Sequence, residues 1–294
     1  MAVATHGHGG GRLRRAVLAA LRATASQRVN MVAAGCAFYA TLALFPTITM
    51  LISLYGLVFN PHNVQPQLAY LRNFMPPAAF SLISDRINTL VAAPARGLGL
   101  GFGISLAISL WSSSTGTKSI LNALSLAYHE RETRGFWRFQ IVSLAMTLIA
   151  IIASVMAIGF LVAVPVVLAF LGATAYAKFL AGLISYGAMI AFLLMALALL
   201  YRFGPAQPLR ERGTYAPGTA IAAVAWLAVS WAFGFYMGHF GAYSVTYGPL
   251  AAIIGLMMWF YFTSYAVLFG AEVNAALDRE VRRDKRRERY ESTR

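Results

Sequence analysis

Two ionisable side chains, Lys118 and Glu272, stand inside long apolar segments of this 294-residue chain. An ionisable group at membrane depth is costly and usually faces the bundle interior or a wet cavity. Ser114 and Asn122 lie one helical turn before and after Lys118, on the same face. We therefore expect a polar interior site made of Ser114, Lys118, Asn122, Glu272 and Asn274. The alternative is that Lys118 snorkels to the inner interface and Glu272 pairs with local arginines.

Catalytic and metal-binding patterns are not found in the sequence. Cys36 is the single cysteine, so no disulfide or thiolate cluster can form within the chain. The histidines do not have the spacing of metal ligands. The alternating glycines at 97–103 do not form a dinucleotide-binding fingerprint. We expect no enzyme activity, no catalytic residues, no metal and no cofactor.

Long stretches without charge indicate the helices that carry Lys118, Glu272 and their polar neighbours. The longest runs from Gly213 to Ala271, 59 residues without Asp, Glu, Lys or Arg. Hydrophobic residues make up 59% of the chain and charged residues 12%, about half the usual share of a soluble domain. About 20 consecutive apolar residues span a bilayer. The sequence therefore predicts an integral membrane protein of the all-α class.

Six spans fit the pattern, and basic residues orient them. Nineteen of the 24 Lys and Arg fall at the two termini or in loops 2–3 and 4–5, on one side of a six-span topology. The positive-inside rule then places both termini in the cytoplasm. The expected spans are residues 31–58, 98–127, 139–171, 179–201, 215–239 and 248–276.

Three further segments surround this six-span domain, residues 31–276. Residues 1–30 form a basic arm whose Leu13, Val17, Leu21 and Ala25 share one face, typical of an amphipathic helix on the inner leaflet. Residues 61–96 predict short external helices between spans 1 and 2, and residues 277–294 a basic, solvated tail. We expect arm and tail to contact anionic lipid rather than nucleic acid.

Two stripes of glycine suggest contacts between helices or between copies of the chain. Gly97 with Gly101 and Gly99 with Gly103 are spaced as GxxxG pairs, and Gly234 with Gly238 repeats this spacing. Such small-residue faces let membrane helices approach closely. A homo-oligomer built through these faces is possible on this pattern.

Five strings along the chain resemble signatures of the YihY/BrkB family of bacterial inner-membrane proteins. They are AAGCAFYATLALFP (33–46), WSSSTGTKSILNALSLAYHERETR (111–134), PGTAIAAVAW (217–226), YGPLAAIIGLMMWFYF (247–262) and LFGAEVNA (268–275). Ser113 replaces the family's usual Ala, and Val273 its usual Leu. The resemblance implies a six-span membrane protein. The matching positions are Tyr39, Pro46, Trp111, Asn122, Tyr128, Glu130, Glu132, Arg134, Tyr247, Gly248, Glu272 and Asn274.

Function is less determined than fold. Our first hypothesis is a transporter or flippase-like protein for an envelope lipid or other anionic solute, in which Lys118 meets a phosphate group. The second is a non-transporting scaffold of the envelope, whose polar residues only join helices. Family members have carried a ribonuclease label, but metal-dependent cleavage needs clustered His and Asp ligands that this sequence lacks.

In the loop after span 2 we also expect Glu130 and Arg134 to pair on a helical extension.

Overall fold

The described part of the chain is helical. The computed structural model describes residues 8–58, 80, 84–85, 88, 100–130, 132–170, 174–206, 215–239 and 249–292, and these residues contain no strand. The prediction of an all-α protein is confirmed for this part. The helices are α1 (His8–Thr24), α2 (Gln27–Val58), α5 (Leu100–Ala127), α6 (Phe136–Phe170), α7 (Ala175–Phe203), α8 (Tyr215–His239) and α10 (Pro249–Ser292).

Five segments of the described chain are long and apolar enough to cross a bilayer. They lie in α2, α6, α7, α8 and α10, and are Gln27–Met50, Phe136–Met156, Gly182–Phe203, Tyr215–Tyr236 and Ile253–Arg283. The expected second span corresponds to α5, which is not among the five. Its run from Ser112 to Lys118 is polar, and this lowers the hydropathy of a helix that is otherwise apolar. The external segment 61–96 lies almost wholly outside the described residues.

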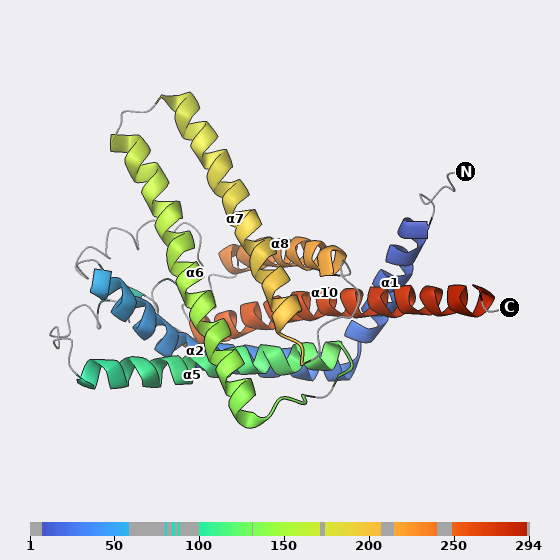
Figure 1. Ribbon diagram of the computed structural model, residues 1–294. Helices are drawn as coiled ribbons and strands as arrows, with labels where there is room; N and C mark the ends of the chain where they lie inside the picture. Colours follow the sequence, from blue (N-terminus) through green and yellow to red (C-terminus); the bar gives the residue numbers. More distant parts are fainter. Residues whose placement is uncertain are drawn as a thin grey trace.

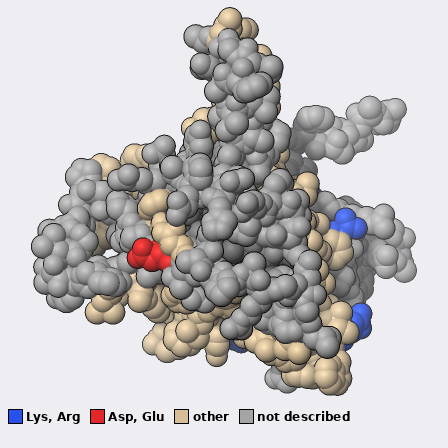
Figure 2. Space-filling view, turned by 90° about the vertical axis from the view of Figure 1, so that its left-hand side faces the viewer, with Lys and Arg blue, Asp and Glu red and all other residues tan. Residues whose placement is uncertain are grey.

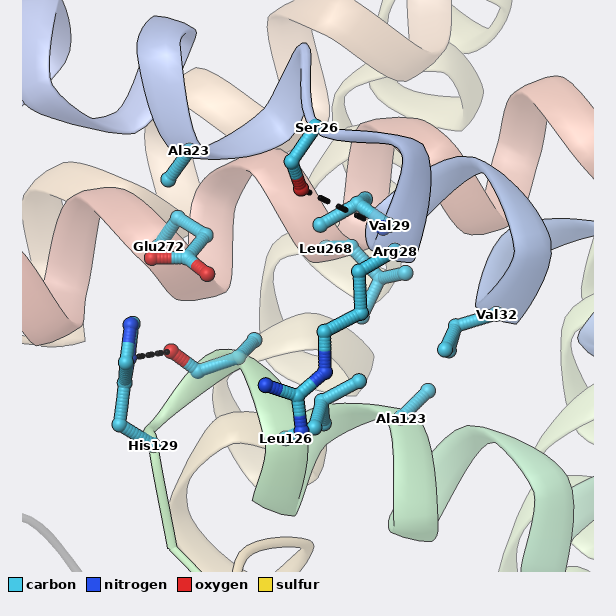
Figure 3. A pocket seen from close by; sticks show the side chains of 11 residues that line it. Ala23, Ser26, Arg28, Val29, Val32, Ala123, Leu126, His129, Leu268 and Glu272 are labelled. Atoms are coloured by element: carbon cyan, nitrogen blue, oxygen red, sulfur yellow. Dashed lines mark hydrogen bonds between the residues drawn. The ribbon is translucent and has the colours of Figure 1, made fainter.

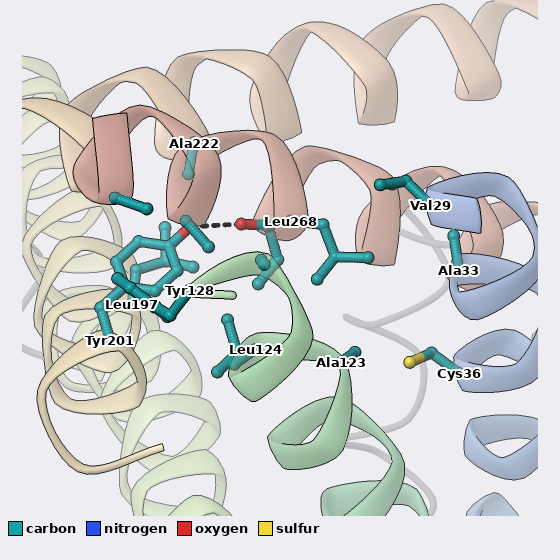
Figure 4. Close-up of a cluster of buried hydrophobic side chains, with 14 of the residues drawn as sticks. Val29, Ala33, Cys36, Ala123, Leu124, Tyr128, Leu197, Tyr201, Ala222 and Leu268 are labelled. Atoms are coloured by element: carbon teal, nitrogen blue, oxygen red, sulfur yellow. Dashed lines mark hydrogen bonds between the residues drawn. The ribbon is translucent and has the colours of Figure 1, made fainter. Parts of the chain in front are cut away.

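The helices α1, α2, α5 and α8 pack against α10. Figure 1 shows α2, α5 and α10 running beside one another, with α6 and α7 forming a hairpin that rises from them. The main core joins α2, α5, α7, α8 and α10 through side chains such as Ala33, Leu124, Tyr201, Ala222 and Leu268 (Figure 4). Small residues dominate this core, as is common where membrane helices approach closely.

Hydrogen bonds between helices supplement this packing. Each is worth about 0.6 kcal/mol on average in a membrane protein, because alternative partners exist in the separated helices. The pairs with their distances are Thr47 Oγ1 to Ser113 Oγ (2.8 Å), Thr147 Oγ1 to Thr117 Oγ1 (2.7 Å), and Tyr201 Oη to the Val267 carbonyl oxygen (2.7 Å). These polar groups are satisfied by neighbouring helices, as the scaffold hypothesis expects for all of them.

The closest helix crossing lies between α8 and α10. A Cβ atom added to Gly218 would overlap the Asn274 side chain and the Gly270 carbonyl oxygen, and one added to Gly270 would lie 2.6 Å from Ala222 Cβ. Only glycine therefore fits at both positions. The crossing brings the string at 217–226 against the string at 268–275.

The last helix continues without a break from the membrane segment into the basic tail. Leu277 and Asp278, which we expected to begin a solvated tail, are 8% and 0% exposed. The reason is that α1 folds back over them: Ala16 and Ala20 pack against Val273, Ala276 and Leu277. Solvation of α10 therefore begins later than the sequence suggested, at Arg279.

The arm is helical, but its buried face differs from the expected one. Val17 joins the contact with α10, whereas Leu13 and Leu21 are 38% and 51% exposed. The small residues Ala16 and Ala20 take the buried positions because they allow the backbones of α1 and α10 to come close.

The outside of the bundle is apolar. Trp231 is 75% exposed, Trp137 72% and Met156 69%. On the face in Figure 2, Lys, Arg, Asp and Glu are sparse among the coloured residues. An exposed surface of this kind suits contact with lipid chains rather than with water.

Candidate functional site: a charged pocket beside the middle of α10

A pocket of about 240 Å³ opens where the turn between α1 and α2 meets the end of α5 and the middle of α10. Its ionisable members come from three parts of the chain and point toward one hollow in Figure 3: Arg28, His129 and Glu272. The remaining lining is Ala23, Ser26, Val29, Val32, Ala123, Leu126, Ala127 and Leu268.

Glu272 is the buried charge of the pocket. The residue is 4% exposed, and its Oε2 atom is buried without a hydrogen-bond partner. Arg28 lines the same pocket, yet the ion pairs among the described residues do not include one between Arg28 and Glu272. The two opposite charges thus face a common hollow without meeting across it.

His129 closes the inner side of the pocket. It follows the end of α5 in a left-handed turn with φ of 58°. Its Nδ1 atom lies 3.0 Å from the Ala127 carbonyl oxygen and 3.2 Å from Nη1 of Arg279. Both contacts involve Nδ1, and Nε2 has no hydrogen-bond partner within the part of the chain that the structure describes.

Lys118 does not share this pocket, contrary to the expected polar interior. Its ammonium lies 5.1 Å from the centre of the Trp111 ring. Asn122 is exposed, while Ser114 is buried and donates to the Trp111 carbonyl oxygen of its own helix at 2.6 Å. With 100° per residue, Lys118 lies about 140° around α5 from Ala123, which faces the pocket. Lys118 and Glu272 were expected to share one site because they lie at similar depths in the membrane. Their side chains point in different directions, so they do not meet.

Asn274 belongs to the α8–α10 crossing rather than to the pocket. Its Oδ1 atom accepts a hydrogen bond of 2.9 Å from the Gly218 backbone N–H. That N–H lies in the first turn of α8, where N–H groups have no partner within the helix. Asn274 therefore caps α8 from a neighbouring helix, while its Nδ2 atom is buried without a partner.

The loop after α5 carries a second charged group. Arg134 donates to Glu132 through Nε and Nη2, each at 2.7 Å, and its Nη2 also donates to the Gly204 carbonyl oxygen at 2.9 Å. These hydrogen bonds from Arg134 lower the pKa of the Glu132 carboxyl. The arrangement fixes the loop to the end of α7.

The expected Glu130–Arg134 pair on a helical extension is wrong. The helix α5 ends at Ala127, and the following residues form a turn, so the i, i+4 spacing no longer brings these two side chains together. Arg134 instead pairs with Glu132, two residues before it. The Glu132 carboxylate also accepts a hydrogen bond of 3.0 Å from the Arg134 backbone N–H.

The remaining motif positions are dispersed. Tyr39 and Trp111 are 46% and 47% exposed, and Tyr128 is 8% exposed in the main core. Pro46 lies within α2, and Glu130 lies in the loop after α5. Tyr247 and Gly248 lie outside the described residues.

Metal coordination finds no support within the described residues. No group of three or more His, Cys, Asp or Glu side chains in that part of the chain could hold a metal ion.

Comparison with known proteins gives the family. The profile of the virulence factor BrkB family matches residues 20–293. The chain belongs to this family. It is 32% identical over 249 residues to the ribonuclease-like protein YfkH of Bacillus subtilis (strain 168), covering 82% of this chain and 87% of that protein.

Other relatives share a shorter segment. A UPF0761 membrane protein of Xanthomonas campestris pv. campestris (strain 8004) is 35% identical over 83 residues, which are 28% of this chain and 19% of that protein. A UPF0761 membrane protein of Xanthomonas axonopodis pv. citri (strain 306) matches to the same extent. No solved structure matches the chain at a significant level.

In this BrkB-family chain, the sequence identified one pocket residue, Glu272, and missed two. Arg28 was counted among the basic residues that set topology, and His129 was set aside because it has no metal-ligand spacing. A signal for both existed: each stands at the end of a span on the same predicted side of the membrane as Glu272. What the sequence lacked was the contact that brings the three ends together.

Proposed function

We propose that this BrkB-family membrane protein is a transporter or flippase-like protein for an envelope lipid or other anionic solute. It has six spans in a bacterial inner membrane, with both termini in the cytoplasm. The pocket at Glu272 is its substrate-binding site.

The main support for this proposal is the buried carboxylate of Glu272, which lies beside an open pocket. Elsewhere in the bundle, polar side chains such as Thr47, Thr147 and Tyr201 bond neighbouring helices. Several other described side chains, such as Tyr128 and Gln140, also keep a buried polar atom without a partner, but they do not line this pocket. Glu272 combines an unpartnered buried oxygen with a hollow that also contains Arg28. A carboxylate within a membrane segment is expensive, and it is usually retained for a ligand, ion or proton pathway. This favours transport over a scaffold.

The six-span topology rests on α5. Its 28 residues are about 42 Å long at 1.5 Å per residue, enough to cross a hydrocarbon core of about 30 Å. Its polar residues do not all face lipid, because Ser113 bonds Thr47 of α2 and Thr117 bonds Thr147 of α6. The start of α1 and the end of α10 also lie toward the same side in Figure 1, in keeping with an even number of crossings.

Flux through purified protein tests the proposal. The protein is reconstituted in vesicles with a fluorescent phospholipid, and the outer leaflet is bleached with dithionite to follow exchange between leaflets. We expect faster exchange than in empty vesicles, and a marked loss of rate in Glu272→Gln. Thr47→Val, which removes a bond between helices, is the matched control and should keep most of the rate. A protein that reconstitutes and folds but gives no exchange and no solute flux is better described as a scaffold.

We also propose that the protein is not a ribonuclease. The label belongs to the Bacillus relative, and comes to this chain by similarity alone. Highly purified protein should show no RNA cleavage beyond that of a mock preparation, with or without divalent metal. Cleavage that a point substitution in this chain abolishes would contradict the proposal.

A further inference from the structure

The pocket presents two opposite charges that are separated and not paired. Glu272 offers a buried oxygen without a partner, and Arg28 offers a guanidinium with no ion pair among the described residues. The Glu272 carboxylate is buried, so leaving one of its oxygens without a partner is costly unless a ligand supplies a donor. Arg28 is exposed, so its guanidinium is available to the same ligand.

A purely anionic group fits this pocket poorly. It would suit Arg28 and His129, but the Glu272 carboxylate would repel it. A simple cation has the reverse difficulty, because Arg28 lies on the opposite side of the hollow. A ligand that carries both charges a few bonds apart can place its cation on Glu272 and its anion on Arg28 and His129.

We infer that the pocket binds a zwitterionic amino-phosphate headgroup, with its ammonium on Glu272 and its phosphate on Arg28 and His129. This rests on the proposed function and narrows its substrate class. The ammonium would donate to the unpartnered Oε2 of Glu272. The Arg28 guanidinium suits phosphate because its planar N–H groups can bond two oxygens at once.

Apolar walls complete the fit to a lipid. Val29, Val32 and Leu268 line the pocket beside the charged groups. Pocket residues Ser26 and Arg28 are exposed at the turn between α1 and α2, so a headgroup can enter from the protein's surface. The site is therefore placed to accept a headgroup while the acyl chains stay outside the helix bundle.

Binding of defined lipids to the full-length protein in detergent tests this inference, by native mass spectrometry and by thermal shift. The probes are phosphatidylethanolamine, phosphatidylglycerol, phosphatidylcholine and water-soluble phosphoethanolamine. Wild-type protein should bind phosphatidylethanolamine about tenfold more tightly than phosphatidylglycerol, which lacks the ammonium, and than phosphatidylcholine, whose quaternary amine cannot donate a hydrogen bond. This comparison needs no variant, so a folding defect cannot obscure it.

Variants then assign the charges. Glu272→Gln should abolish the preference for phosphatidylethanolamine, because it removes the partner of the ammonium. Arg28→Gln should weaken the binding of all three lipids, because each carries a phosphate. Glu280→Gln and Arg22→Gln make the same changes of charge outside the pocket and should leave both the preference and the affinities unchanged. Equal binding of all three lipids, or a preference that survives Glu272→Gln, would overturn the inference.

The source of the headgroup and the proposed function separate in the same experiments. Binding of free phosphoethanolamine as tight as that of the lipid would support the pocket and assign it to a soluble amino-phosphate. Selective binding without any flux would support the pocket and contradict transport. Lipid exchange without headgroup preference would overturn the inference and leave transport standing.

Discussion

At the scale of single residues, the fit between α8 and α10 leaves no room for a side chain at Gly218. Asn274 reaches across to the first turn of α8, and Gly218 lets it approach. Neither role was visible in the sequence, where Asn274 looked like part of a polar interior and Gly218 like the start of a span. A capping bond between helices that are distant in sequence leaves no local signature.

Gly218→Ala should destabilise the protein by about 1–3 kcal/mol, the usual cost of forcing a methyl group into a packed site. The added Cβ would meet Asn274 and the Gly270 carbonyl oxygen. Thermal unfolding in detergent measures the effect. Gly234→Ala in the same helix is the control, because no heavy atom lies within 4 Å of the new Cβ. Similar melting temperatures for the two variants would show that the crossing is looser than described.

The Glu132 carboxyl gives a pH-dependent prediction. Its pKa is lowered by the hydrogen bonds from Arg134, so the pair stabilises the fold above the unfolded-state value, about 4.3, and this stabilisation is lost as pH falls through the folded-state pKa. The wild-type melting temperature should fall more steeply between about pH 5 and pH 3 than that of Glu132→Gln. Parallel pH profiles would mean that the pair contributes no net stability.

At the scale of elements, the loop between α5 and α6 is hydrogen-bonded to the end of α7. Arg134 is 8% exposed in its side chain and bonds both Glu132 and the Gly204 carbonyl oxygen. Sequence periodicity suggested that α5 would continue through this loop. The turn at His129 ends the helix and changes the direction of the charged side chains that follow. The i, i+4 spacing of a helix therefore predicted Glu130 as the partner of Arg134, whereas the partner is Glu132.

Arg134→Lys should cost about 2 kcal/mol, because lysine keeps the charge but cannot bond Glu132 and Gly204 together. Thermal unfolding is again the measurement. Arg138→Lys, at an exposed position of α6, serves as the control and should change the melting temperature little. A neutral Arg134→Lys would indicate that a single charged contact suffices.

The arm makes its own prediction at this scale. Leu21 is 51% exposed on α1, and we expect it to contact the acyl region of an anionic leaflet. A fluorophore on Leu21→Cys, in a Cys36→Ala background, should be quenched by doxyl-labelled lipid, more strongly with phosphatidylglycerol and less at high salt. Ala19→Cys, which lies on the opposite face, is the control. Equal quenching at both positions would contradict a surface-bound helix.

At the scale of the whole molecule, charge-free segments were sufficient to predict the helices. The expected starts and ends of the four middle spans lie within about four residues of α5, α6, α7 and α8. Their mutual rotation was not predictable, because hydrophobicity surrounds each helix and no polar face points to the partner. Lys118 shows the consequence: the helix was placed correctly, and its side chain was not.

Cysteine accessibility tests the proposed topology. In intact cells with Cys36→Ala, Thr174→Cys in the loop between α6 and α7 should react with a membrane-impermeant maleimide. Gly135→Cys, in the loop between α5 and α6, should react only after the cells are opened. Labelling of Gly135→Cys from outside would overturn the arrangement with both termini in the cytoplasm.

Oligomers through the glycine faces remain a prediction; cross-linking at Gly103→Cys and Gly234→Cys would detect them.

The unbroken length of α10 links the pocket to the basic end of the chain. Its 44 residues extend about 66 Å, roughly twice the hydrocarbon thickness, and Glu272 lies on the same rod as the basic end. The α1 helix is strapped to that rod by the contact of Arg15 with Glu280 at 3.1 Å. A pull or a twist applied to the C-terminal end of α10 is therefore expected to reach the pocket through one continuous helix.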